Sequence, residues 1–192
     1  MDSPQNQGGA IEAAGLTAEW ERDLHVASLR YFTAAGPFAA QVRESIGAPL
    51  PEPLRANTIT GASGHAHFIL AWRSPSETMI LSDNRAAFTD LETRLAAAAA
   101  DGCMVDQTGG IWGLQVRGGR ARALLQRLAA TTAIPAVGEA RSGRLAELHV
   151  LTVCVQAEEY ILLVERVYAD HLFQWVGRTL QDLQGWDAMV RS

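Results

Sequence analysis

The sequence predicts an α+β domain made of two similar halves, each running strand, helix, strand, strand, helix. Apolar residues alternate between the two-residue period of strands and the wider spacing of helices. The pattern also recurs along the chain, because Glu77 precedes an apolar run as Glu159 does, and Leu29 matches Leu114 at a similar offset. The 192 residues are 48% hydrophobic and 19% charged, which is enough for one sizeable core.

The first half is expected over about residues 23–101. Pro37 suits a first helical turn, where its missing N–H costs nothing, and Gly47 ends that helix. Gly102 is expected to end the second helix in a left-handed conformation. The predicted strands cover residues 24–33, 65–72 and 78–82, and the predicted helices cover 37–46 and 86–100.

The second half is expected over about residues 102–185. It opens with a short buried strand at Cys103–Asp106 that joins the halves, and Asp106 is expected to accept hydrogen bonds from the following turn. Residues 131–142 are expected to form a loop. The other predicted strands cover residues 110–116, 145–155 and 160–165, and the predicted helices cover 120–130 and 168–183.

Three aromatic residues are candidates for an interface with a partner protein. Residues 1–22 are rich in Gly, Ala and Gln and are expected to form a flexible arm, in which Trp20 is a candidate anchor. Trp175 shares a predicted helix face with Leu172 and Val176, so it is either an anchor or a core residue. Tyr168, at the start of the same helix, is the third candidate.

Composition excludes several classes of function. The net charge of −5 argues against a nucleic-acid surface. All 16 basic residues are arginine, so neither a Schiff-base lysine nor a P-loop lysine is available. The chain shows neither a secretory signal nor an apolar run long enough for a membrane span, so we expect a cytoplasmic protein. Cys103 and Cys154 are expected as reduced thiols, with a single disulfide as the alternative.

No catalytic or metal site is predicted from the residues. The sequence contains no nucleophile elbow, HExxH motif, EF-hand loop or P-loop. His65 and His67 share a strand face but lack a third ligand nearby, and zinc needs three or four. The Gly118-Gly119 pair before a helix could hold an anion, although an ordinary strand–helix turn is favoured. Glu158 and Glu159 are expected to be solvated at a turn.

Three stretches carry a resemblance to a known family. They are LAWRSPSETMIL, MVDQTGGIWGLQVRGGRARALLQRL and EEYILLVERVYADHLFQWV, and the third is the most specific. Together they resemble the gamma subunit of heterotetrameric sarcosine oxidase, a family whose fold is that of aminomethyltransferases and their folate-binding domains. The residues that carry the third match are Arg166, Tyr168, Ala169, Leu172 and Trp175.

The resemblance implies a non-catalytic subunit of a flavoprotein complex that oxidatively demethylates sarcosine to glycine. It implies alpha, beta and delta partner subunits, which carry FAD, FMN and NAD and pass the one-carbon unit to tetrahydrofolate. The resemblance assigns this chain no catalytic, cofactor-binding or metal-binding residue. It leaves open whether the substrate is sarcosine or another N-methyl amino acid. The alternatives are a stand-alone folate-binding aminomethyltransferase-like protein and a free-standing dimeric interaction module.

Overall fold

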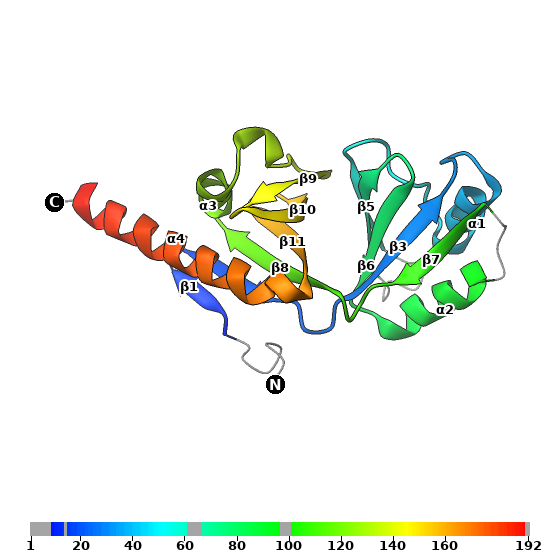
Figure 1. Ribbon diagram of the computed structural model, residues 1–192, viewed down its shortest axis with the longest axis horizontal. Helices are drawn as coiled ribbons and strands as arrows, with labels where there is room; N and C mark the ends of the chain where they lie inside the picture. Colours follow the sequence, from blue (N-terminus) through cyan, green and yellow to red (C-terminus); the bar gives the residue numbers. More distant parts are fainter. Residues whose placement is uncertain (1–8, 14, 61–66, 97–100, 191–192) are drawn as a thin grey trace. The chain divides into compact units, whose positions relative to one another are not determined.

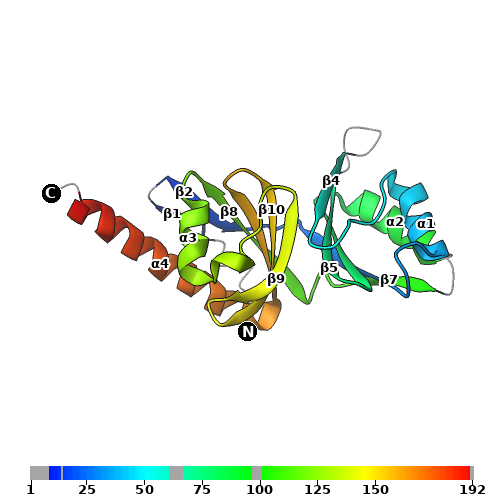
Figure 2. The same cartoon turned by 90° about the horizontal axis from the view of Figure 1, so that it is seen from above.

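The computed structural model describes residues 9–13, 15–60, 67–96 and 101–190. The chain divides into two compact units. We call residues 23–110 with 138–140 the central unit, and residues 1–22, 111–137 and 141–192 the terminal unit. Figures 1 and 2 label the elements of both units. The fold is mixed, with two antiparallel sheets and four α-helices in the described residues.

The central unit is a five-stranded sheet with two helices packed on it. The strand order is β4-β5-β6-β3-β7. Its core joins Leu29, Leu70 and Ile80 of the sheet to Phe38 and Leu91 of the helices. The elements are β3 (His25–Tyr31), α1 (Pro37–Ile46), β4 (Ala56–Thr60), β5 (His67–Ser74), β6 (Glu77–Ser82), α2 (Arg85–Ala96) and β7 (Gly102–Asp106).

The terminal unit is a six-stranded sheet in the order β1-β2-β8-β11-β10-β9. Its elements are β1 (Ile11–Ala13), β2 (Leu16–Trp20), β8 (Ile111–Gly118), α3 (Ala121–Leu128), η2 (Thr131–Ala133), β9 (Glu139–Leu145), β10 (Leu148–Gln156), β11 (Glu159–Glu165), η3 (Arg166–Tyr168) and α4 (Ala169–Val190).

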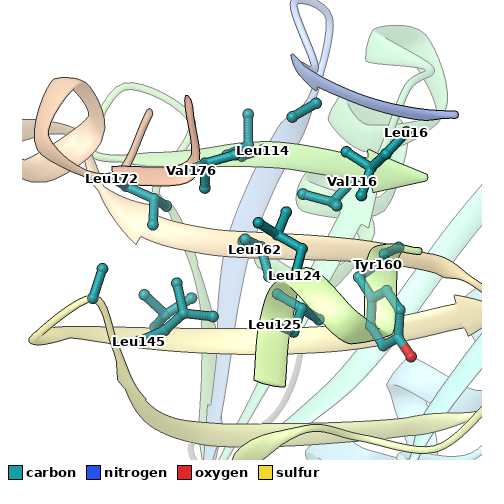
Figure 3. Packing of buried hydrophobic residues seen from close by; sticks show 14 of the residues in the cluster. Leu16, Leu114, Val116, Leu124, Leu125, Leu145, Tyr160, Leu162, Leu172 and Val176 are labelled. Atoms are coloured by element: carbon teal, nitrogen blue, oxygen red, sulfur yellow. The ribbon is translucent and has the colours of Figure 1, made fainter. Parts of the chain in front are cut away.

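The core of the terminal unit lies between its sheet and the helices α3 and α4. Leu114 and Leu162 of the sheet belong to the same buried cluster as Leu124 and Leu125 of α3, and Figure 3 shows Leu162 next to Leu124 and Leu125. All four side chains are completely buried. The apolar faces that the sequence assigned to residues 110–116, 160–165 and the helix after residue 120 therefore form one continuous core.

Several predicted elements are confirmed. α1 has Pro37 in its first turn and ends at Gly47, whose φ of 77° is left-handed. Asp106 accepts hydrogen bonds from the backbone N–H and the hydroxyl of Thr108, as expected for the residue before that turn. Cys154 is buried.

The N-terminal arm is the largest correction. Residues 11–13 and 16–20 are strands rather than a loose arm, and β2 pairs with β8 from Leu16↔Gly118 to Trp20↔Leu114. This pairing joins segments that are distant in the sequence, so local periodicity gave no sign of it. Leu16 and Ala18 are buried in the core as a result.

The strand at residues 102–106 is also different from the prediction. It is not a buried strand joining two halves but the edge strand β7 of the central unit, next to β3. Cys103 is exposed, and Gly102 belongs to the strand rather than to a left-handed helix cap. The strands β4 and β9 were missed, because Thr, Asn, Gly and Arg interrupt their apolar pattern.

The two sheets share a strand order. Setting β4, β5, β6, β3 and β7 beside β9, β10, β11, β8 and β2 matches them position by position. The fifth strand differs in origin. In the central unit it is β7, which follows α2, and in the terminal unit it is β2, which comes from the N-terminal segment. The internal repeat of the sequence itself stays a prediction.

Candidate functional site

An exposed aromatic surface lies at the start of α4. We call Val167, Tyr168, His171 and Trp175 the α4 aromatic surface. Val167 is 80% exposed, Tyr168 47% and Trp175 42%. The rings of His171 and Trp175 have centroids 6.2 Å apart. Exposed aromatic side chains that lie together are candidates for contact with another protein.

Trp175 is therefore not a core residue. Leu172, Val176, Leu180 and Leu183 of α4 are buried. At about 100° per residue these four fall within an arc of about 80°, and Trp175 lies about 60° outside it. The apolar spacing of the sequence was correct, but it placed Trp175 at the margin of the buried stripe.

Trp20 lies in a different environment from the other two candidates. Its ring packs edge-on against Trp112 at 5.5 Å and lies 5.9 Å from Phe173. It is half-buried against the core of the terminal unit. The structure thus leaves Tyr168 and Trp175 exposed and places Trp20 in internal packing.

A second feature is a hollow of about 600 Å³ in the central unit, which the sequence did not predict. It lies where β3 ends, β6 begins and β7 starts. Phe32 at its rim is 86% exposed. The lining residues are Arg30, Tyr31, Phe32, Ser76, Glu77, Asp101, Gly102 and Cys103. The hint in the sequence was Arg30, a charged residue in a mostly apolar strand.

Glu77 is the centre of the polar network at this hollow. Its Oε1 accepts a hydrogen bond from the hydroxyl of Ser28, which is buried. The same oxygen lies 3.5 Å from the guanidinium of Arg73 and 3.6 Å from Nε of Arg30. Because Nε of Arg30 also lies 3.4 Å from the Ser28 hydroxyl, this side chain is held at its inner end. Among the described residues the terminal amino groups of Arg30 have no acceptor, so they can bond to an external one.

Asp101 connects the hollow to the start of α1. Its Oδ1 accepts a hydrogen bond of 3.0 Å from the backbone N–H of Phe38. Gly36, at the N-cap position, has no side chain to cap the helix. The carboxylate of Asp101, from a segment distant in the sequence, caps it instead. Oδ2 of Asp101 is buried without a hydrogen-bond partner in the described residues. That oxygen lies where a side chain at Gly36 would otherwise stand.

The N-terminus of α3 is also capped by a carboxylate from elsewhere in the chain. Oε2 of Glu158 accepts a hydrogen bond of 3.0 Å from the backbone N–H of Arg122. Glu159 accepts a bond of 2.9 Å from the amide of Gln115. These two carboxylates are not simply solvated, contrary to the expectation. The helix start after Gly118-Gly119 already carries a carboxylate of the same chain, which argues against an anion site there.

Tyr160 lies beside this helix start, and it is almost completely buried. Burial raises the pKa of Tyr160 above its ordinary value of 10.0, and a hydrogen bond with Arg122 opposes the shift. Figure 3 shows Tyr160 at one end of the core, near α3. The group is structural, since it ties β11 to the first turn of α3.

Neither cysteine forms a disulfide, and Cys103 is exposed whereas Cys154 is buried. In the residues that the structure describes, no three His, Cys, Asp or Glu side chains lie together as metal ligands would. His65, one of the two histidines considered above, lies outside the described residues. None of the described helices combines the length and hydropathy of a membrane-spanning segment.

The described residues that line the hollow are groups that bind other molecules. They include a thiol, a guanidinium and two carboxylates. The oriented guanidinium and the exposed ring of Phe32 are groups that recognise a ligand or partner. The candidate sites are thus two recognition surfaces, one on each unit.

The fold has close counterparts among solved structures, although no protein-family model and no curated protein matches the sequence. One counterpart is heterotetrameric sarcosine oxidase from Corynebacterium sp. U-96 in complex with pyrrole 2-carboxylate. The TM-score is 0.76 at 17% identity, covering 96% of this chain and 96% of that chain.

Another counterpart is the glycine cleavage system aminomethyltransferase T from Bartonella henselae. The TM-score is 0.62 at 13% identity, covering 85% of this chain and 46% of that chain. This chain therefore corresponds to less than half of the aminomethyltransferase. At such identities the likeness establishes a shared fold, which is that of sarcosine oxidase and aminomethyltransferase chains.

Proposed function

We propose that this chain is a non-catalytic, gamma-type subunit of a heterotetrameric flavoprotein sarcosine oxidase. The observation that carries the proposal is the fold correspondence over 96% of both chains. The α4 aromatic surface supports it, because a subunit needs exposed apolar groups for assembly. The complex would oxidatively demethylate sarcosine to glycine in the cytoplasm. Its FAD, FMN, NAD and tetrahydrofolate would be bound by alpha, beta and delta subunits.

The second candidate is a folate-binding, aminomethyltransferase-like protein that acts alone. The fold correspondence with aminomethyltransferase T favours it. Its weakness is the coverage, since the corresponding region is 46% of that chain and a shared fold does not transfer a ligand site. The exposed aromatic residues also have no role in this alternative.

Affinity purification of the tagged chain from its native cell tests the proposal. We expect larger subunits to co-elute, with the absorbance spectrum of a flavin and with sarcosine-dependent reduction of that flavin. A colourless chain that elutes alone and binds tetrahydrofolate would contradict the proposal and support the second candidate. A colourless dimer of this chain without folate binding would instead indicate a free-standing interaction module.

A further inference from the structure

We infer that the free edge of β7 and the adjoining hollow bind an extended segment of a partner subunit, which adds to the central sheet as a further strand. This inference rests on the proposed function, because the occupant is one of the flavin-bearing subunits. The segment would carry an acidic side chain opposite Arg30 and apolar side chains beside Phe32 and Val105.

The backbone groups of β7 point alternately toward β3 and away from it. The N–H of Phe32 donates to the carbonyl of Asp101 at 3.0 Å, and the N–H of Gln107 donates to the carbonyl of Val26 at 2.8 Å. Bonded and non-bonded pairs alternate in an antiparallel ladder. With the register Arg30↔Cys103 and Ser28↔Val105, the peptide groups of Cys103 and Val105 therefore point to β3.

The peptide groups of the alternate residues point the other way. Gly102, Met104 and Asp106 direct their N–H and C=O groups away from β3, to the side where no described strand pairs with β7. None of these backbone groups has a hydrogen-bond partner within the described part of the chain. An edge of this kind is the template that strand addition uses.

The opposite edge of the same sheet is covered where β4 begins. There the N–H of Ala56 donates to the carbonyl of Gly138 at 2.9 Å, and the N–H of Ala140 donates to the carbonyl of Leu54 at 3.0 Å. Arg55 and Glu139 form a bridge between these bonds. The chain thus covers the start of the β4 edge with its own backbone, and the described residues provide no such cover at β7.

The side chains around β7 indicate the chemistry of the incoming segment. Arg30, opposite Cys103 in the register, has a side chain that is 60% exposed and anchored only through Nε in the described residues. Glu77 is shared between the guanidinium groups of Arg30 and Arg73, and Asp101 caps α1, so a positive charge remains at this network for an incoming carboxylate. Val105 and Phe32, which are 37% and 86% exposed, provide apolar contacts along the same edge.

Hydrogen exchange at single-residue resolution tests the inference on the purified complex and on the lone chain. We expect the amides of Gly102, Met104 and Asp106 to exchange at least about tenfold more slowly in the complex. The amides of Cys103 and Val105 bond to β3 and should be protected in both states. Alkylation of the exposed Cys103 by N-ethylmaleimide should also slow in the complex.

A proline variant provides the matched genetic test. Met104→Pro removes one outward N–H and leaves the hydrogen bonds of Cys103 and Val105 to β3 in place. An edge strand tolerates proline at such a position. Met104→Val keeps that N–H and is the control for the changed side chain. We expect Met104→Pro to lose co-purification of the flavin-bearing subunits and Met104→Val to retain it, with similar melting temperatures.

A charge variant tests the guanidinium. Arg30→Gln should weaken assembly at least about tenfold. Arg94→Gln removes a surface arginine that pairs with Asp90 on α2, and should leave assembly unchanged.

The outcomes separate this inference from the proposed function. Flavin-bearing subunits that co-elute without slower exchange at Met104 would overturn the inference alone. A chain that elutes without them would overturn both. Slow exchange in the lone chain that depends on its concentration and disappears in Met104→Pro would assign the edge to a second copy, which also contradicts the inference.

Discussion

Single residues decide how closely segments of this chain approach one another. Gly102 is an example, because a Cβ there would meet the ring of Phe38 at 2.4 Å and the carbonyl oxygen of Arg30 at 2.7 Å. The sequence predicted a helix-capping role for this glycine. Its position in β7 shows that the missing side chain instead lets the edge strand lie against α1.

Gly102→Ala should lower the free energy of unfolding by about 2 kcal/mol, since Phe38 or the strand must move. Gly109→Ala is the matched control, because a Cβ there meets no heavy atom within 4 Å, and its effect should stay within about 0.5 kcal/mol. Urea titration of both variants measures the difference. Equal stabilities would show that the contact at Gly102 relaxes without cost.

Tyr160 makes stability depend on alkaline pH. Burial raises its pKa above 10.0 in the folded chain, so the folded state keeps its proton after the unfolded state has released its own. The corresponding stability is complete below pH 10 and is lost as the pH rises through the folded pKa. Tyr160→Phe should cost about 1 kcal/mol at neutral pH and show a smaller loss above pH 10. Parallel slopes for both proteins in urea titrations above pH 10 would contradict this.

At the scale of elements, two helices begin without a cap of their own. α1 starts at Gly36 and α3 at Arg120, and neither N-cap residue makes a side-chain cap hydrogen bond. Asp101 and Glu158 supply the acceptors from segments distant in the sequence. The carboxylates also lie at the positive ends of the helix dipoles. Helix initiation here is therefore a tertiary contact.

Asp101→Ala should destabilise the protein by about 1 kcal/mol, because it leaves the N–H of Phe38 without its acceptor. Asp101→Asn keeps an oxygen at that position and should cost less. Asp90→Ala, on the exposed side of α2, is a control expected to change stability by less than about 0.5 kcal/mol. Thermal unfolding of the three variants should give this order, and an Asp101→Ala protein as stable as Asp90→Ala would argue against the cap.

At the scale of the whole molecule, each unit has its own sheet and its own core. The N-terminal segment belongs to the terminal unit through β2, while residues 102–110 belong to the central unit. The boundary expected near residues 101 and 102 thus lies near residues 110 and 111. Each unit also presents its own candidate recognition surface.

The two tryptophans should separate stability from assembly. Trp20→Ala removes a ring packed on Trp112 and Phe173, so it should lower the free energy of unfolding by about 3 kcal/mol. Trp175→Ala should leave stability within about 0.5 kcal/mol and weaken binding to the flavin-bearing subunits by about 2 kcal/mol. Urea titration and co-purification yield measure the two effects. Unchanged complex yield for Trp175→Ala would remove the α4 aromatic surface from the interface.

The sequence by itself determined most of the regular elements. The weak alternation of β3, the apolar runs of β6, β8 and β11 and the apolar stripes of α3 and α4 follow from periodicity, and Pro37 and Gly47 mark the bounds of α1. These features depend on residues within a few positions of one another. They could therefore be predicted before any contact between distant segments was known.

Only the tertiary structure decided the rest. The pairing of β2 with β8, the edge position of β7, and the caps from Asp101 and Glu158 all join segments far apart in the sequence. The hollow beside Arg30, the internal packing of Trp20 and the exposure of Trp175 also depend on contacts between distant segments. The physical reason is that periodicity shows which residues an element buries, whereas exposure and partner depend on which other segment covers that element.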